Sequence, residues 1–228
     1  MLQIILDFGS GNTCKNDLEY IHRMIDVLAF VVQKKQRPID KQYNDVSYFD
    51  QWAGLKEIII KWQLFEAAGT NLPLTQDSFA SAYEYGVSKG FRVTSSVFDE
   101  ASLRFLLQFN IPFVKIANNR KLDYLIDLIP KEIPVYTSYG RKADLIEHLG
   151  DSNIPLACVS EYPVNIEKYE QEFGSMLLRK AVSDHTPGLE LYKKYQPDIW
   201  EKHYKLSDSV GLDAGPFAIT PEELEEIL

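Results

Sequence analysis

Residues 57–62 read Glu-Ile-Ile-Ile-Lys-Trp, and this stretch decides the fold class. A short run that is nearly all apolar is typical of a strand buried on both faces, as the strands of a parallel sheet are. A loop through Pro73 follows, and then a helical pattern over about residues 76–89. One strand followed by one helix is the βα unit, from which parallel sheets are built.

The same unit recurs on both sides of this stretch, from one end of the chain to the other. The strands that we expect are Gln3–Asp7, Glu57–Trp62, Phe91–Ser95, Pro112–Ile116, Pro134–Thr137, Pro155–Cys158, Ala181–Ser183 and Asp198–Glu201. The helices that we expect are Asp17–Lys34, Gln76–Lys89, Glu100–Phe109, Lys121–Leu128, Arg141–Leu149, Ile166–Arg179, Gly188–Tyr195 and a last one capped by Thr220 and Glu223. Residues 35–55 are interpreted as a long connection with some local structure.

Eight strand–helix pairs predict an α/β fold that closes into a TIM (β/α)8 barrel. A flavodoxin-like doubly wound sheet would need only five or six strands. The chain has 228 residues, 45% of them hydrophobic, which suits a single barrel domain over residues 1–228. We see no linker or low-complexity tract.

Charge and cysteine usage exclude several classes of protein. The 24 basic and 33 acidic residues give a net charge of −9, which argues against a nucleic-acid partner. A small anionic substrate remains compatible, because a cleft can be locally positive on an acidic protein. No apolar stretch is long enough to cross a membrane and the N-terminus resembles a strand, so we expect a cytoplasmic protein. Cys14 and Cys158 are interpreted as free thiols.

Polar residues follow or end every expected strand. They are Asp7; Lys61 and Gln63; Ser95 and Ser96; Lys115; Ser138; Ser160 and Tyr162; Ser183, Asp184 and His185; and Glu201, Lys202 and His203. In a TIM barrel the carboxyl ends of the strands form the active-site face. We therefore expect these side chains to meet around one positively charged hollow.

Two lysines within apolar runs are the most informative of these residues. Lys61 and Lys115 each lie on an expected strand, where an ammonium group must be paired or must bind an anion. The alternative is that either one points to the rim and is solvated.

Two of the four histidines, His185 and His203, come just after neighbouring strands. Imidazole is a common ligand of divalent transition metals, and Glu201, Asp184 and Asp7 are carboxylates expected nearby. Mn²⁺, Mg²⁺ or Zn²⁺ would fit such a set, although spacing alone does not decide for a metal site. His22 and His148 fall on expected helices and are interpreted as structural or solvated.

Several short motifs occur in one order along the chain. They are Lys61-Trp62-Gln63, Ser95–Asp99, Lys115-Ile116-Ala117, Thr137–Gly140, Cys158–Pro163, Ser183-Asp184-His185-Thr186 with Gly188, and Glu201-Lys202-His203-Tyr204. In this order they resemble the N-acetylneuraminate (sialic acid) synthase family, over about residues 3 to 224.

The resemblance implies a reaction and a set of site residues. Family members condense phosphoenolpyruvate with an N-acylated aldose, such as N-acetylmannosamine or a related sugar, to give a nonulosonic acid and phosphate. The implied roles are a metal, Mn²⁺ or Mg²⁺, on His185 and His203; catalysis by Asp7, Glu201 and Tyr162; and substrate binding by Lys61, Gln63, Ser96, Lys115, Asn118, Arg120, Ser138, Ser160, Ser183, Asp184 and Asp213.

The departures from the family pattern concentrate on the sugar side. Asp7 begins a segment that lacks the family's histidine, Asn118 to Arg120 replace Ser-Gly and an acid, and Gly211 to Ala214 replace Gly-Pro-Asp-His. We interpret the chain as a short form without the family's C-terminal antifreeze-like domain. Arg120 is then expected to take the place of the arginine that this domain lends, and a homodimer is possible.

Two other functions are compatible with the same residues. One is an aldolase or lyase acting on a 2-oxo acid, with Lys61 or Lys115 as a Schiff-base lysine. The other is a catalytically degenerate barrel that binds a small anionic ligand, motivated by the missing histidine and by Arg120.

Overall fold

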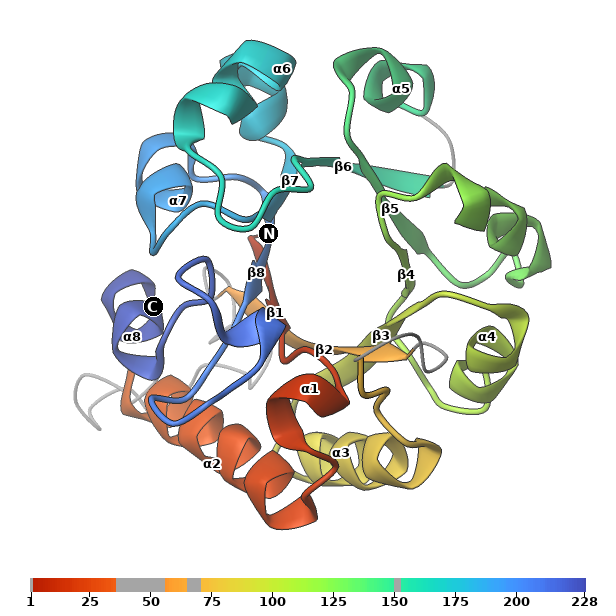
Figure 1. Ribbon diagram of the computed structural model, residues 1–228, viewed down its shortest axis with the longest axis vertical. Helices are drawn as coiled ribbons and strands as arrows, with labels where there is room; N and C mark the ends of the chain where they lie inside the picture. The colour runs from red at the N-terminus through yellow and green to blue at the C-terminus, as the bar shows by residue number, and fades with distance from the viewer. Residues whose placement is uncertain (1, 36–55, 65–70, 150–152) are drawn as a thin grey trace, which may run out of the picture.

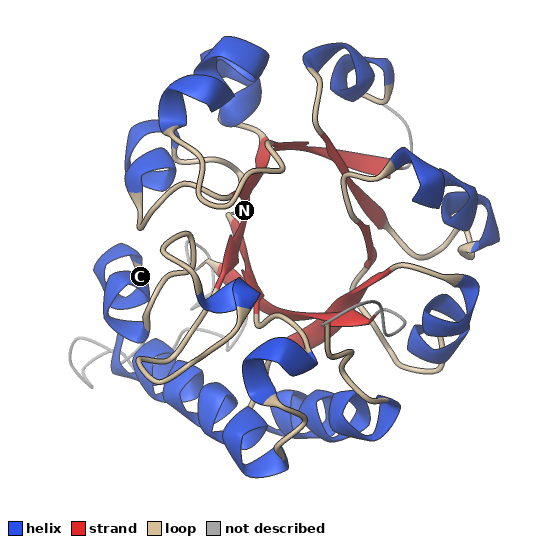
Figure 2. Cartoon of the chain, viewed as in Figure 1, coloured by secondary structure: helices blue, strands red, loops and turns tan. Residues whose placement is uncertain are grey.

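Eight parallel strands close into a barrel in the order β1 to β8, with helices around the outside (Figures 1 and 2). The structure is a computed structural model, and it describes residues 2–35, 56–64, 71–149 and 153–228. The strands are β1 (Gln3–Asp7), β2 (Glu57–Leu64), β3 (Arg92–Val97), β4 (Val114–Ile116), β5 (Val135–Tyr139), β6 (Asn153–Cys158), β7 (Ala181–Asp184) and β8 (Ile199–His203). The TIM barrel predicted from the sequence is thus confirmed.

The helices of the barrel follow their strands in the expected order. They are α2 (Leu18–Lys35), α3 (Gln76–Ser88), α4 (Glu100–Leu106), α5 (Lys142–Glu147), α6 (Ile166–Leu178), α7 (Glu190–Tyr195), α8 (Pro221–Ile227) and the 3-10 helix η2 (Arg120–Leu128). Polar caps set their starts: the side chains of Thr75, Asp99 and Asn165 each accept a backbone N–H of the first turn. Thr220 and Glu223 form the expected capping box on α8.

Two short helices were not expected from the sequence. They are α1 (Gly11–Cys14) and the 3-10 helix η3 (Leu212–Ala214), which contact each other beside the mouth of the barrel. The segment expected as a helix over Lys121–Leu128 is a 3-10 helix rather than an α-helix, and its nine residues make it longer than most helices of this type. The long connection expected over 35–55 lies outside the described residues from residue 36 onward.

Alternation along the strands creates two separate sets of side chains. Outward-facing residues such as Trp62, Val93 and Trp200 pack against the helices in the main core cluster. Inside the barrel, the layer beneath the site contains Ile5, Ile59, Phe113, Tyr136, Leu156 and Ala181. The rings of Phe113 and Tyr136 stack there with centroids 4.0 Å apart. The inside of the barrel is therefore filled below the level of the site.

No helix among the described residues is long and apolar enough to span a membrane. The free thiols Cys14 and Cys158 are both buried, as expected of unpaired cysteines in the core. The imidazole of His22 contacts the Ser81 hydroxyl and that of His148 contacts the Asp144 carbonyl oxygen, which agrees with the structural interpretation of both histidines.

Candidate active site

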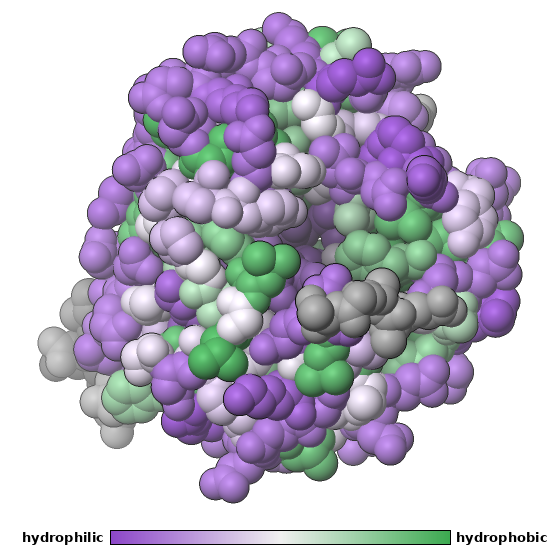
Figure 3. All heavy atoms as spheres, viewed as in Figure 1, coloured by the Kyte–Doolittle hydropathy of each residue, from purple (hydrophilic) through white to green (hydrophobic). Residues whose placement is uncertain are grey.

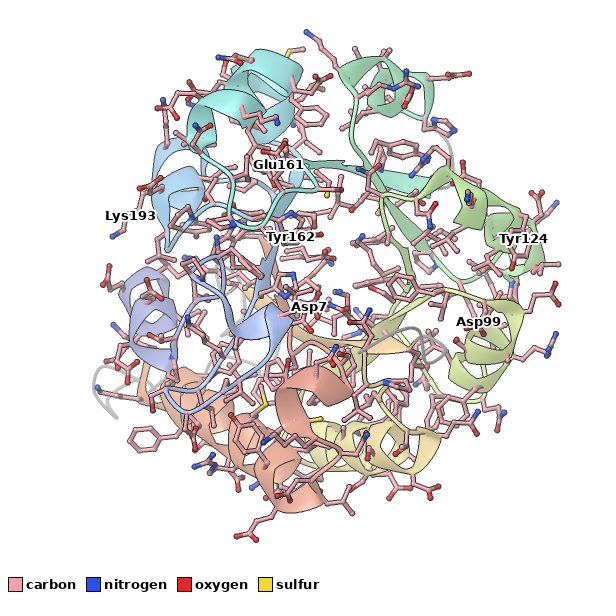
Figure 4. The ribbon with its side chains drawn as sticks, in the orientation of Figure 1. Asp7, Asp99, Tyr124, Glu161, Tyr162 and Lys193 are labelled. Carbon is pink, nitrogen blue, oxygen red and sulfur yellow. The ribbon has the colours of Figure 1, made fainter. Side chains whose placement is uncertain are left out.

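A cavity of about 340 Å³ opens at the carboxyl ends of the strands. In the space-filling view the molecule is hollowed near its centre (Figure 3). The cavity is lined by Asp7, Lys61, Gln63, Ser96, Phe98, Lys115, Ala117, Asn118, Asn119, Ser138, Cys158, Ser160, Tyr162, Ser183, His185, Glu201, His203, Leu212, Asp213 and Phe217. In Figure 4, Asp7 and Tyr162 lie toward the centre of the ring, whereas Tyr124 and Lys193 lie outside it. Most of the expected site residues therefore meet at one place, whereas Ser95, Arg120, Asp184 and Lys202 do not line the cavity.

Strand alternation explains this convergence. Each charged residue of the cavity floor comes two positions after an apolar residue of the inner layer or one packed against it. The four pairs are Ile5 and Asp7, Ile59 and Lys61, Phe113 and Lys115, and Ile199 and Glu201. Side chains two residues apart on a strand share a face, so each of these groups stands directly above that layer. The lysines thus point into the barrel, and the alternative that they are solvated at the rim is wrong: each is 2% exposed.

Lys61 forms a buried ion pair at the base of the cavity. Its Nζ lies 2.6 Å from Asp7 Oδ2 and donates to Ser96 Oγ at 3.0 Å. Gln63 Nε2 donates to the same carboxylate oxygen at 2.9 Å. Burial alone would raise the pKa of Asp7, but Lys61 and His203 outweigh it and hold that pKa well below its usual range. In turn, burial would lower the pKa of Lys61, but Asp7 raises it, so both groups are charged.

Lys115 has a longer ion pair than Lys61 and also donates to the Ile116 carbonyl oxygen at 3.1 Å. Its Nζ donates to Ser138 Oγ at 2.7 Å and lies 3.8 Å from Glu201 Oε1. Burial lowers the pKa of Lys115 despite the attraction of Glu201. Ser183 Oγ donates to Glu201 Oε1 at 2.8 Å, and Glu201 Oε2 is buried without a hydrogen-bond partner among the described residues. Glu201 therefore keeps one oxygen free for a ligand or a proton.

The cavity is not positively charged, which corrects the expectation from the sequence. Its lining includes two lysines, Lys61 and Lys115, and three carboxyl groups, those of Asp7, Glu201 and Asp213. Burial raises the pKa of Asp213, although His203 and Lys61 oppose that shift. An anionic substrate would thus meet a site whose cations are already compensated.

The imidazoles of His185 and His203 lie close to each other in the cavity wall. Their ring centroids lie 5.7 Å apart, and the Tyr162 ring lies 4.1 Å from that of His185. His185 Nδ1 lies 2.7 Å from the Val159 carbonyl oxygen, which can only accept, so Nδ1 holds the proton and Nε2 keeps its lone pair. Burial together with His203 lowers the pKa of His185 to about 4, so its imidazole is neutral at pH 7.

This pair of imidazoles fits a metal ion as two of its ligands. Histidines that bind a metal usually donate their other ring N–H to a carbonyl or carboxylate oxygen, as His185 does to Val159. His203 Nδ1 is buried without a hydrogen-bond partner among the described residues, so this nitrogen is available to a ligand. The part of the chain that the structure describes contains no arrangement of three His, Cys, Asp or Glu side chains suited to a metal ion. Water or substrate oxygens would have to complete the coordination.

Asp184 and Arg120 do not line the cavity, although both were expected to bind substrate. Asp184 faces outward from β7, and its carboxylate lies 3.1 Å from Lys202 Nζ. The Arg120 guanidinium donates to the Ser138 carbonyl oxygen at 2.6 Å and covers the ring of Tyr139 at 4.2 Å. The guanidinium also contacts the Asp123 carboxylate at 3.4 Å.

Six residues of the cavity wall were not expected from the sequence: Phe98, Ala117, Asn119, Cys158, Leu212 and Phe217. Cys158 could have been found, because it ends β6 two residues before Ser160. Phe217 lies beyond the last strand and packs against His203 with ring centroids 5.0 Å apart. No local signal marks it, since only the folded loop brings it to the site.

Comparisons with known proteins relate the sequence of this chain to the NeuB family. The model of the NeuB family matches residues 56–228. The N,N'-diacetyllegionaminic acid synthase of Legionella pneumophila is 24% identical over 227 residues, which cover 89% of this chain and 62% of that protein. The chain thus spans less than two thirds of the length of this curated relative.

Solved structures share the fold. The N-acetylneuraminic acid (sialic acid) synthetase of Leptospira borgpetersenii, crystallised with citrate, has a TM-score of 0.64 at 22% identity over 98% of this chain and 80% of its own. A putative spore coat polysaccharide biosynthesis protein E of Chromobacterium violaceum has a TM-score of 0.71 at 15% identity, over 99% of this chain and 72% of its own.

Proposed function

The chain belongs to the NeuB family, and on that basis we propose that it condenses phosphoenolpyruvate with an N-acylated aldose. The products would be a nonulosonic acid and phosphate, and the acceptor would be N-acetylmannosamine or a related sugar. The observation that carries the proposal is the meeting of two buried ammonium groups and two imidazoles in one cavity at the carboxyl ends of the strands. This is the face on which TIM-barrel enzymes carry their active sites.

The proposed reaction makes one carbon–carbon bond and exchanges the C2–O bond to phosphate for a C2–O bond to the oxygen of water. The C3 carbon of phosphoenolpyruvate attacks the aldehyde carbon, and the aldehyde oxygen takes up a proton. Positive charge then develops at C2, where water adds and loses a proton. The new C2 hydroxyl group then gives its proton to the leaving phosphate as the C2–O bond to phosphate breaks, which leaves a 2-oxo acid. Charge has to be stabilised at the aldehyde oxygen and on the phosphate, and fixed donors serve this well.

Different residues of the cavity would bind the anionic groups, transfer the proton and contact the sugar. Lys61 and Lys115 would bind the phosphate and carboxylate groups, with hydroxyl donors from Ser96, Ser138 and Ser183. Glu201, whose Oε2 has no hydrogen-bond partner among the described residues, would accept the proton of the attacking water. Asp7 keeps Lys61 charged, and Tyr162 closes the wall beside His185. Gln63, Asn118, Ser160 and Asp213 would contact the remaining hydroxyl groups of the substrates.

His185 and His203 would hold the divalent metal, Mn²⁺ or Mg²⁺. When bound, such an ion would polarise the aldehyde oxygen. The Val159 carbonyl oxygen orients the His185 ring so that Nε2 stays available.

An assay with several sugars tests the proposal. The protein is incubated with phosphoenolpyruvate, Mn²⁺ and a panel of N-acylated aldoses, while phosphate release is followed and products are identified by mass spectrometry. We expect sugar-dependent release of phosphate and a product whose mass equals acceptor plus pyruvate. Calorimetric binding of phosphoenolpyruvate and Mn²⁺ without turnover across the panel would favour the degenerate binding barrel instead.

A Schiff-base aldolase is the second candidate, because burial lowers the pKa of Lys115 and so favours the free amine that this chemistry needs. Borohydride in the presence of a 2-oxo acid would then link the acid covalently to Lys115. Under the leading proposal no such adduct forms, and the mass of the protein stays unchanged.

A further inference from the structure

A second set of polar residues lies behind the site, on the outer face of β7 and β8, the paired strands that Figure 1 labels side by side. Ser183 and Glu201 point into the cavity, and their neighbours Asp184 and Lys202 point outward between the barrel and the helices. Both outward side chains are fully buried, at 0% exposure. A buried ion pair thus lies one residue away from each of the two cavity imidazoles.

The hydrogen bonds of this pair connect the two strands. Asp184 Oδ2 accepts from Lys202 Nζ at 3.1 Å and from Trp200 Nε1 at 2.9 Å, both on β8. Asp184 Oδ1 accepts from the backbone N–H and the hydroxyl of Thr186, at 2.8 and 2.7 Å. Lys202 Nζ also donates to the Thr186 carbonyl oxygen at 2.5 Å. The residues on both sides of His185 are therefore fixed to β8.

The position of the pair matters more than its contribution to stability. Asp184 and Lys202 lie opposite each other as the last pair in the register of β7 and β8, next to the loops at the carboxyl ends of the strands. His185 follows the first and His203 follows the second. A buried ion pair costs desolvation that two apolar side chains would not, so it is weak evidence for stability as such.

A third residue supports the same segment from α6. The Tyr169 hydroxyl donates to the Ser183 carbonyl oxygen at 2.6 Å and accepts from the His185 backbone N–H at 3.1 Å. Tyr169 is itself fully buried. The backbone of His185 is thus held from the helix side as well as from β8.

We infer that Asp184 and Lys202 are positioning residues that set the separation of the His185 and His203 imidazoles for a shared divalent cation. The inference rests on the proposed function, since it takes these imidazoles as the metal ligands. Residues outside the immediate ligands commonly change metal affinity by about 10- to 100-fold. Loss of the link between the strands should therefore weaken the cation site while the barrel persists.

The test is the double substitution Asp184→Asn with Lys202→Met. It removes both charges and the two bonds that Lys202 Nζ donates, to Asp184 and to the Thr186 carbonyl oxygen, but leaves an amide oxygen that can accept from Thr186. Mn²⁺ affinity is measured by the loss of the free-ion electron paramagnetic resonance signal, and the Co²⁺-loaded protein is compared by visible absorption. We expect at least about tenfold weaker Mn²⁺ binding and a shifted Co²⁺ band.

A control is Glu57→Gln with Arg92→Met, which removes a partly exposed ion pair between neighbouring strands at the opposite end of the barrel. It should bind Mn²⁺ like the wild type. Equal Mn²⁺ affinity and equal Co²⁺ spectra in the Asp184/Lys202 variant and the wild type would overturn the inference. A wild-type protein that binds no Mn²⁺ would instead end the metal-dependent function itself.

Thermal unfolding identifies a double variant that does not fold. In that case Thr186→Val serves, because it removes one hydroxyl bond to Asp184 and keeps the shape of the side chain. We expect about two- to fivefold weaker Mn²⁺ binding from this smaller change. Unchanged affinity in a folded Thr186→Val protein would contradict the positioning role.

Discussion

At the scale of single residues, Asp7 and Asp184 show that an aspartate at the end of a strand can point to either face of the sheet. Asp7 lies inside the barrel beside Lys61, whereas Asp184 lies outside it beside Lys202. The sequence placed both at strand ends and assigned both to the site. Period-two alternation excludes that for Asp184, since Ser183 and His185 already occupy the inner face.

Asp7→Asn should destabilise the protein, because it leaves the Lys61 ammonium buried without an opposite charge. Removal of one partner from a buried ion pair costs about 3–5 kcal/mol. The free energy of unfolding in urea at pH 7 measures this change. Ser96 and Gln63 remain as polar neighbours, so a loss below about 1 kcal/mol would mean that they suffice to solvate the ammonium.

The same variant gives a pH dependence with a defined sign. The pKa of Asp7 is lowered in the folded protein, so its stabilising contribution is present above the unfolded-state pKa of about 3.9 and is lost as the pH falls below it. The difference in unfolding free energy between wild type and Asp7→Asn should therefore shrink below about pH 4. A difference that stays constant from pH 7 to pH 3 would contradict the lowered pKa.

At the scale of elements, the strands were largely predictable and the short helices were not. Gln3–Asp7 was predicted with the observed bounds, and β8 was found but runs on to His203, two residues past its expected end. The α1 and η3 helices escaped because each has only three or four residues, too few for a periodic pattern. The two helices contact each other, and the Ser10 side chain caps the start of α1.

Gly9→Ala should disturb the loop that joins β1 to α1 and with it the cavity. Gly9 has φ of +78°, and an added Cβ would lie 2.5 Å from Thr13 Oγ1 and 2.8 Å from Asp213 Oδ2. We expect a loss of about 1–3 kcal/mol of stability together with weaker Mn²⁺ binding, since Asp213 adjoins His203. Calorimetry measures both.

Thr220→Ala is the control for this element-scale change. It removes the capping box of α8 and should cost about 1 kcal/mol of stability, while Mn²⁺ binding stays unchanged because Thr220 does not line the cavity. If both variants bind Mn²⁺ like the wild type, the loop at Gly9 does not support the site.

At the scale of the whole molecule, the balance of charge in the cavity decides how an anion can bind. Three carboxyl groups compensate the two lysines, so a polyanion such as phosphoenolpyruvate needs a further cation. Removal of metal by a chelator should therefore weaken phosphoenolpyruvate binding at least about tenfold, and added Mn²⁺ should restore it. Calorimetric titrations with and without chelator measure the effect. Equal affinities would show that the lysines alone suffice.

The sequence could predict the barrel and most of the cavity wall because both follow from local patterns. Strand ends mark Lys61 and Glu201, and the closed sheet brings them together whatever the loops do. Charge balance could not be read in this way, because it depends on Asp213, which a distant loop carries to His203. The cytoplasmic location and the possible homodimer stay predictions, and light scattering would test the second.

The stacked rings of Phe113 and Tyr136, with the isoleucines around them, close the barrel beneath the cavity. Substrates and products cannot pass through this layer, so they must enter and leave the cavity from the side of the loops that follow the strands. A bulky product must then back out along the route by which the next acceptor arrives. Product is therefore expected to compete with acceptor for entry, and turnover at high product concentration should slow even while the chemistry itself is unimpaired.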